Sequence, residues 1–224
     1  MSKETQNKQN FIILWGVSIS PYVRKVMVAL AEKGIAYEQK EILPKVLLEA
    51  TGQKVPVEFN QASPLGKIPT LQIGDYSLAD SAVIAAYLDR KFSTGNQLYP
   101  RTPEAYAKAR WFEQYSDTVL TDIAYHKIFL ERVIKPKVLN QAVDEKRIIS
   151  ATTQELPAVL DYLQNSLSKN LWLAGHEFSM ADVAVATQFL ALEMTGFEFP
   201  KDRWARLHEY FKQIISRASF KGIA

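Results

Sequence analysis

Ser20 carries a hydroxyl group that could take part in binding or catalysis, and it lies at the predicted start of a helix. Pro21 follows it, and proline is favoured at the first helical position because that position does not need an N–H. Val23, Val26 and Leu30 then recur at offsets of three and four residues, which predicts a helix with one apolar face. Ser20 therefore occupies the N-cap, at the positive end of the helix dipole.

Two interpretations of Ser20 remain open at this point. The apolar run at 11–15 predicts a buried strand before it, and ligands of open α/β sheets bind beyond the carboxyl ends of strands. As a cap, the hydroxyl would accept a hydrogen bond from the N–H of Tyr22 or Val23. Alternatively, it faces a cleft and donates to a bound anion or thiolate, and one hydroxyl can do both.

A second helix start follows a predicted hairpin. Gly74 and Asp75 separate two short strands, as in a two-residue hairpin loop. Asp80 or Ser81 then caps a helix, whose N-terminus also suits a bound carboxylate. The apolar positions of this helix are Val83, Ile84, Tyr87 and Leu88.

Composition narrows the function classes. The 224 residues carry a net charge of +3 without a run of like charges, which argues against nucleic-acid binding. The absence of cysteine excludes disulfides, cysteine-ligated zinc and a thiol nucleophile, and we expect a cytoplasmic protein. The three histidines lie too far apart in sequence to suggest a metal site, and no apolar run approaches the roughly 20 residues of a membrane span. The polar residues 1–10 are expected to form a flexible tail, not a secretory signal.

The pattern changes along the chain in a way that predicts two domains. Residues 11–92 alternate strands and helices, 93–103 form a linker rich in polar residues and proline, and 104–224 are helical. Within the helical part, Ser179 and Asp182 have the spacing of a capping box. We therefore expect a structural role for Asp182, although a buried acid could be mistaken for a catalytic one.

Taken together, four motifs resemble those of the cytosolic glutathione transferases of the serine type. They are SPYVRKV at 20–26, GKIPTL at 66–71, DSAVI at 80–84 and SMAD at 179–182. The resemblance covers about residues 11–220. It implies a thioredoxin-like N-terminal domain, a C-terminal helical bundle domain, a homodimer, and a cis Ile68–Pro69 peptide bond.

The same resemblance implies a glutathione site, with glutathione as co-substrate and no cofactor. Ser20 would face the glutathione sulfur, with Ser18 and Tyr22 as alternatives. Redox relatives carry cysteine at the positions of Ser20 and Val23, so exchange through a protein disulfide is excluded here.

Other contacts to glutathione are implied by the flanking motifs. The backbone of Ile68, before Pro69, would pair with the cysteinyl part. Ser81 would bind the γ-glutamyl carboxylate and Asp80 the ammonium, although the family more often has the longer Glu there. Candidates for the glycine carboxylate are Lys54 and Lys67.

The implied activity is conjugation of glutathione to apolar electrophiles, a detoxification reaction. Alternatives are glutathione-dependent peroxide reduction or isomerisation, and a non-catalytic glutathione-binding protein. The second substrate would lie against aromatic side chains, which could equally well be core. These candidates are Tyr22, Phe112, Tyr115, Tyr125 and Phe129.

Overall fold

The computed structural model describes residues 11–223, so the predicted tail at 1–10 lies outside the described residues. The chain divides into two compact units, Met1–Asn96 and Gln97–Ala224. The division falls inside the linker predicted at 93–103.

The first unit is built on a four-stranded sheet with the order β2-β1-β3-β4. β1 pairs with β2 in parallel and with β3 antiparallel, and β3 pairs antiparallel with β4 across the predicted hairpin. The strands are β1 (Ile12–Trp15), β2 (Glu38–Lys40), β3 (Thr70–Ile73) and β4 (Tyr76–Ala79).

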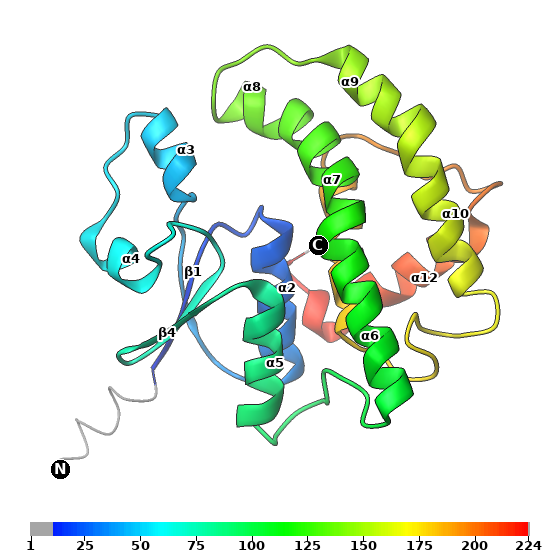
Figure 1. Ribbon diagram of the computed structural model, residues 1–224, viewed down its shortest axis with the longest axis horizontal. Coiled ribbons are helices and arrows are strands. Elements are labelled where there is room, and N and C mark those ends of the chain that lie inside the picture. The colour runs from blue at the N-terminus through cyan, green and yellow to red at the C-terminus, as the bar shows by residue number, and fades with distance from the viewer. Residues whose placement is uncertain (1–10, 224) are drawn as a thin grey trace. The chain divides into compact units, whose positions relative to one another are not determined.

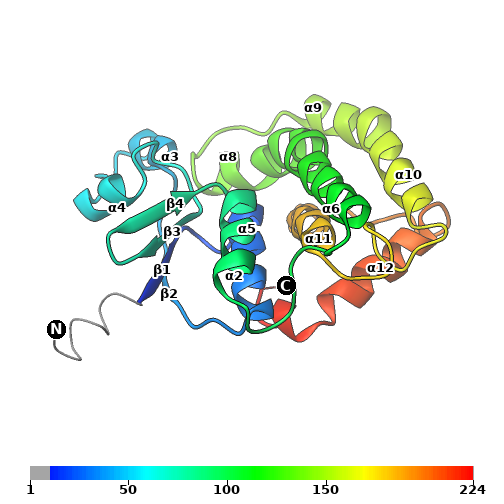
Figure 2. The same ribbon diagram turned by 60° about the horizontal axis from the view of Figure 1, so that its bottom comes forward.

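Helices cover both faces of this sheet. α2 (Pro21–Glu32) and α5 (Ser81–Lys91) lie side by side on one face, and α3 (Lys45–Ala50) and α4 (Val57–Ala62) lie on the other (Figures 1 and 2). Alternation along β1 explains this, because Leu14 and Trp15 point to opposite faces. The order of strands and helices confirms the expected thioredoxin-like domain.

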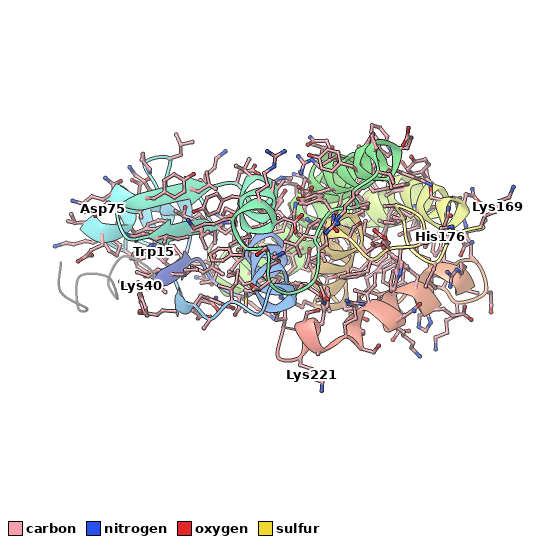
Figure 3. All side chains as sticks on the ribbon, turned by 90° about the horizontal axis from the view of Figure 1, so that it is seen from below. Trp15, Lys40, Asp75, Lys169, His176 and Lys221 are labelled. Atoms are coloured by element: carbon pink, nitrogen blue, oxygen red, sulfur yellow. The ribbon has the colours of Figure 1, made fainter. Side chains whose placement is uncertain are left out.

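Packing within the unit follows the predicted faces. Val23, Val26 and Leu30 of α2 are fully buried, as their spacing predicts. On the other face, the ring of Trp15 lies 5.7 Å from that of Phe59 in α4, a helix that the sequence pattern did not predict. The Nζ of Lys40 lies over the ring of Trp15, 4.7 Å from the ring centre, at the distance of a cation–π contact (Figure 3).

The second unit is all-helical, as expected. Two long helical runs each alternate α-helical and π-helical segments, and a third group of helices follows them. The first run contains α6 (Pro103–Tyr115), η1 (Ser116–Leu120), α7 (Thr121–Ile123), η2 (Ala124–Ile134) and α8 (Lys135–Lys137). The second contains α9 (Glu145–Ser150), η3 (Ala151–Glu155) and α10 (Leu156–Ser166). The last group is α11 (Met180–Glu193), α12 (Ala205–Ile215) and η4 (Ala218–Phe220).

α11 forms the core of this second unit. Its residues are buried from Met180 to Leu192, since α6, η1, η2 and α12 all pack against it. The predicted capping box at its start is confirmed, and the Asp182 carboxylate accepts the Ser179 N–H at 2.9 Å. Asp182 thus has the structural role expected from its spacing. Among residues 11–223 no helix is long and apolar enough to cross a membrane.

Candidate active site

The register of the sheet brings three sequence motifs of the first unit to one edge. Trp15, the last residue of β1, pairs with Thr70, the first residue of β3. Thr70 in turn pairs with Ala79, the last residue of β4. The segments that adjoin these residues are 16–20, 66–69 and 80–81, and they must therefore lie near one another although up to sixty residues separate them in sequence.

Gly16 shows how closely two of these segments approach. Its φ is +140°, a conformation that side-chain-bearing residues rarely adopt. A Cβ at this position would stand 2.5 Å from Cγ2 of Val23 and 3.1 Å from Cβ of Ile68. Only glycine lets the loop before α2 pack against both α2 and the 66–69 segment.

The Ser20 hydroxyl lies at the N-terminus of α2 and does not cap it. Ser20 is the N-cap residue with extended backbone (φ −72°, ψ 126°) and Pro21 follows, as predicted. Its side chain accepts no capping hydrogen bond, and it is 8% exposed. No other hydrogen bond of this hydroxyl is found among the described residues. Within residues 11–223 the hydroxyl proton is therefore not committed to another group.

The alternative hydroxyl of Ser18 is engaged elsewhere. It donates a hydrogen bond to Oε1 of Glu41 at 3.1 Å. Tyr22, the other alternative, is a half-buried residue of the first turn of α2 and also has an interaction partner within the chain. The geometry therefore favours Ser20 among the three candidates.

The segment before β3 is held in place by its own side chains. The Lys67 carbonyl accepts hydrogen bonds from the hydroxyls of Ser63 at 2.8 Å and Thr70 at 3.2 Å. The expected cis peptide bond between Ile68 and Pro69 is confirmed. Within residues 11–223 neither the N–H nor the C=O of Ile68 has a hydrogen-bond partner, so both are available to pair with an extended peptide.

Asp80 and Ser81 form the third segment. Asp80 has φ 74° and ψ 122°, a strained conformation that costs about 1–3 kcal/mol and is typical of functional sites. Its Oδ1 caps α5, accepting the N–H groups of Ala82 at 3.0 Å and Val83 at 3.1 Å. Ser81, the first residue of α5, is buried, and in the described part of the chain its hydroxyl makes no hydrogen bond.

Comparison with known proteins agrees with this geometry. The family model for the glutathione S-transferase N-terminal domain matches residues 14–97, and the model for the C-terminal domain matches 123–218. This chain belongs to the glutathione S-transferase family.

Individual transferases match over most of their length. Glutathione S-transferase F10 of Arabidopsis thaliana is 31% identical over 208 residues, which is 90% of this chain and 91% of that protein. Glutathione S-transferase 3 of Zea mays is 32% identical over 170 residues, covering 75% and 72%. A structure of glutathione S-transferase-I bound with lactoylglutathione has a TM-score of 0.80 at 24% identity, covering 95% of this chain and 98% of that one. At that identity the structural match shows a shared fold.

The two lysine candidates for the glycine carboxylate are less well defined by their surroundings. Lys67 is exposed on the same segment as Ile68, whereas Lys54 is exposed in the loop between α3 and α4. Lys45 at the start of α3 also lies beside this segment, because its N–H donates to the Gly66 carbonyl at 2.8 Å. The segment thus has the cationic side chain of Lys67 on it and that of Lys45 beside it.

The aromatic candidates of the second unit differ in burial. Phe112 and Phe129 are 2% and 0% exposed, which is the core placement that the sequence also allowed. Tyr115 is half-buried, with its ring 4.9 Å from that of Tyr162. Tyr125 is half-buried and stacks on Phe129 at 5.3 Å, and burial raises its pKa. Tyr115 and Tyr125 are therefore the candidates of this set that have solvent-exposed surface for contact with a substrate.

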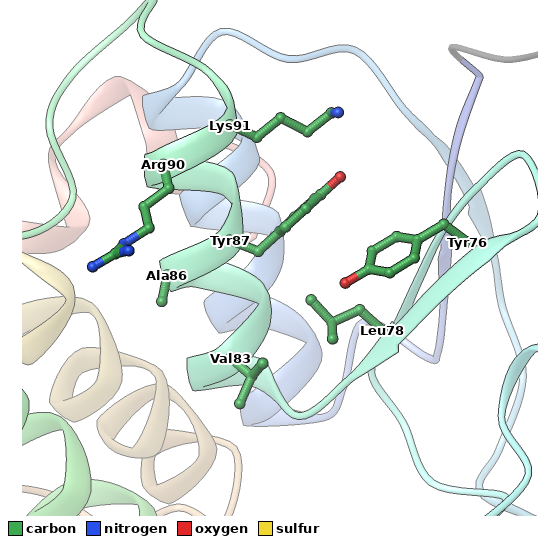
Figure 4. A pocket seen from close by; sticks show the side chains of 7 residues that line it. All are labelled: Tyr76, Leu78, Val83, Ala86, Tyr87, Arg90 and Lys91. Carbon is green, nitrogen blue, oxygen red and sulfur yellow. The ribbon is translucent and has the colours of Figure 1, made fainter.

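The first unit also has an apolar groove that the sequence analysis missed. It has a volume of about 460 Å³ and is open to solvent, with the rings of Tyr76 and Tyr87 facing each other at 5.5 Å (Figure 4). Val83 is one of the apolar positions that helical spacing picked out, yet it is 49% exposed, because α5 buries Ile84 and Leu88 instead. The groove is lined by Tyr76, Leu78, Val83, Ala86, Tyr87, Arg90 and Lys91. Tyr76 and Leu78, two residues apart on one strand face, are the signal that could have revealed it.

Proposed function

We propose that this chain is a glutathione transferase that binds glutathione at the shared sheet edge and conjugates it to apolar electrophiles. The single observation that carries the proposal is the Ser20 hydroxyl, buried at the N-terminus of α2 and not used as a cap. Family membership supports it, as does the lactoylglutathione bound by a protein of the same fold.

The residues of the sheet edge suit a tripeptide. The free N–H and C=O of Ile68 can pair with the cysteinyl backbone, which is the pairing of an added β-strand. The Ser81 hydroxyl, at the positive N-terminal end of α5, suits the γ-glutamyl carboxylate. Asp80 uses Oδ1 as a cap, which leaves Oδ2 for the ammonium. Lys67 and Lys54 remain the candidates for the glycine carboxylate.

Ser20 would act on the glutathione sulfur by donating its proton in a hydrogen bond. A thiol of pKa about 8.5 is only a few per cent ionised at neutral pH. A shift of about 2 pKa units needs about 2.7 kcal/mol. A hydrogen bond to a charged group supplies about 1.5–3 kcal/mol and a helix N-terminus about 0.3–1 kcal/mol. These two contributions suffice, so no general base is required.

The conjugation step follows from the thiolate. On binding, the thiol proton leaves to solvent and the sulfur keeps the electron pair. That pair forms a bond to an electrophilic carbon, while the leaving group departs with its own bonding pair or the charge moves onto the acceptor. Tyr22, Tyr115 and Tyr125 are the partly exposed aromatic candidates for contact with an apolar electrophile.

We also propose that the chain forms a homodimer through the groove described above. Tyr76 and Val83 are about half exposed, and packing them against a second copy of the chain would remove their apolar surface from water. Arg90 and Lys91 at its rim would give the interface a polar edge.

The experiment that tests the enzymatic proposal is a titration of bound glutathione, following thiolate absorbance against pH. We expect a thiol pKa well below that of free glutathione, and a rise towards the free value in Ser20→Ala. Conjugation by that variant should fall about 100-fold or more, as on loss of a donor worth about 2.7 kcal/mol. Ser18→Ala is the matched control, since Ser18 donates to Glu41.

The outcomes separate the candidate functions. Tight binding with an unshifted thiol pKa would favour a non-catalytic binding protein. A shifted pKa without conjugation, but with turnover of peroxides, would favour glutathione-dependent peroxide reduction. Retained activity and a lowered melting temperature in Ser20→Ala would refute the role given to Ser20.

A further inference from the structure

Arg24 is a cation of α2 whose side chain has no hydrogen-bond or ion-pair partner among residues 11–223. It lies four residues after Ser20 and is half-buried, and its Nε and Nη1 are shielded from solvent without a hydrogen-bond partner. Within residues 11–223 no carboxylate pairs with it. Burial lowers its pKa, yet a guanidinium stays protonated in proteins. The chain therefore holds a charged group in a partly desolvated position without a counter-charge.

Other buried charged groups of the chain do have partners. Lys33 at the end of the same helix is 4% exposed and its Nζ lies 3.4 Å from Asp89. In the second unit, the buried Glu113 pairs with Arg110. A shielded polar group without a partner costs about 1–3 kcal/mol, and more when it is charged. Arg24 thus differs from the paired charged groups Lys33 and Glu113, and an anion from outside the chain could supply its missing partner.

The geometry of the helix places Arg24 near the Ser20 hydroxyl. Residues four apart lie on the same helix face, and the Arg24 N–H donates to the Ser20 carbonyl at 2.9 Å. The two residues are separated by about 6 Å along the helix axis. Because Cα–Cβ bonds tilt towards the helix N-terminus, the Arg24 side chain leans over the turn that begins at Ser20.

We propose that Arg24 is a cationic residue of the thiolate site and stabilises the glutathione anion held by Ser20. The proposal rests on the proposed function, because that function supplies the anion. Ser20 provides a hydrogen bond at the sulfur, and Arg24 provides a full positive charge one turn away. The partial positive charge of the helix terminus has the same sign, so the three effects add.

The size of the effect follows from the separation. A full opposite charge within about 4–6 Å lowers a pKa by about 1–3 units. Arg24 follows Ser20 by one helical turn, a rise of about 6 Å, so we expect it to lower the thiol pKa by about one unit, the low end of that effect. At a pH below that pKa, loss of the charge should therefore reduce the thiolate fraction about tenfold.

The test is the thiolate titration of bound glutathione in four versions of the full chain. Wild type is compared with Arg24→Gln, which removes the charge, and Arg24→Lys, which keeps it. Lys33→Gln is the matched control, because it removes a buried cation of the same helix about 20 Å from Ser20. The affinity for S-methylglutathione, which has no ionisable thiol, is measured in parallel to detect a merely structural role.

We expect the thiol pKa to rise by about one unit in Arg24→Gln and to stay within about half a unit in Arg24→Lys and Lys33→Gln. Binding of S-methylglutathione should change less than about twofold. Below the thiol pKa, conjugation by Arg24→Gln should fall about tenfold and recover as the pH rises. If Arg24→Gln does not fold, Arg24→Met, which keeps an apolar stem, carries the same expectation.

Several results would overturn the proposal. A wild-type pKa that is depressed and does not move in the neutral variant would show that Arg24 has no part in it. Equal shifts in Arg24→Gln and Arg24→Lys, or a parallel loss of S-methylglutathione binding, would indicate packing or positioning instead of charge. If the thiol pKa of glutathione bound to the wild type is not lowered, the proposed function fails as well. A lowered pKa that does not change in Arg24→Gln contradicts only the role of Arg24, so the two failures are distinguishable.

Discussion

The stability of the second unit should depend strongly on one buried carboxylate, that of Asp182. The side chain is fully buried at the start of α11. Its Oδ1 accepts the Leu173 N–H at 2.9 Å and the Tyr210 hydroxyl at 2.7 Å, and its Oδ2 accepts the Ser179 N–H at 2.9 Å. One carboxylate thus joins the start of the central helix to α12 and to the segment before α11.

Asp182→Ala would leave these three buried donors without an acceptor. Each unsatisfied donor costs about 1–3 kcal/mol, and partial relaxation keeps the total below the sum. We expect a loss of about 3–5 kcal/mol in the free energy of unfolding, or a fall of about 10 °C or more in melting temperature. Asp182→Asn should lower the free energy of unfolding by less, because its amide oxygen still accepts hydrogen bonds. It should not be neutral, because its NH₂ group would face another donor.

The same site predicts a dependence on pH. Burial raises the pKa of Asp182 to about 6, outweighing the hydrogen bonds from Leu173, Tyr210 and Ser179, which lower it. Because the folded-state pKa lies above the unfolded value of about 3.9, the stabilising contribution is complete below that value and is lost as the pH rises through 6. A shift of about 2 units corresponds to about 3 kcal/mol.

Chemical denaturation at pH 4 to 7 measures both effects. The difference in unfolding free energy between wild type and Asp182→Asn should shrink as the pH rises, since only the wild type ionises. A difference that grows with pH would mean that the hydrogen bonds dominate and the pKa is lowered. If Asp182→Ala unfolds like the wild type, the capping argument is wrong.

Three further predictions concern the first unit. Gly16→Ala should cost about 2–4 kcal/mol in unfolding free energy, because its Cβ would enter occupied space. Gly34→Ala, with φ +65° and open space around it, should cost about 1 kcal/mol. If chemical denaturation gives similar losses for the two variants, the close approach at Gly16 is refuted. Ser81→Ala should weaken glutathione binding about tenfold in calorimetry with no change in the thiol pKa, and unchanged affinity would remove its assignment to the γ-glutamyl carboxylate. Val83→Glu should raise the dimer dissociation constant at least tenfold, as measured by analytical sedimentation. Val46→Glu, at a residue of α3 that is 68% exposed, is the control and should leave this constant unchanged. Equal dissociation constants for the two variants would refute the groove as the interface.

Local sequence was sufficient to predict those features that depend on residues a few positions apart, such as helix starts, helix faces and caps. Pro21 after Ser20 predicted the start of α2, and the spacing of Val23, Val26 and Leu30 predicted its buried face. The capping box at Ser179 and Asp182 uses groups three residues apart, so its spacing is visible without a structure. The cis bond before Pro69 came from the family resemblance alone, since nothing in the local pattern distinguishes it from other X–Pro bonds.

Burial of individual side chains could not be predicted in the same way. Val83 and Ile84 both fit the apolar spacing of α5, yet one is half exposed and the other fully buried. The difference depends on how the helix is rotated against α2 and the sheet, which is a property of the packed unit. The same holds for Phe112, which the aromatic pattern could not distinguish from a pocket residue.

The sequence by itself determined the order of most elements, although not α4, together with the two-part organisation and the candidate residues, because periodicity, capping and turn chemistry act over a few positions. Tertiary structure decided what those candidates can do. Sheet pairing set Trp15 beside Thr70 and Thr70 beside Ala79, which gathered distant motifs at one edge. The folded chain also pairs Ser18 with Glu41, while the Ser20 hydroxyl and the Arg24 guanidinium have no partner among the residues that the structure describes. Whether a polar group is satisfied depends on atoms far away in the chain, and only the folded arrangement places those atoms.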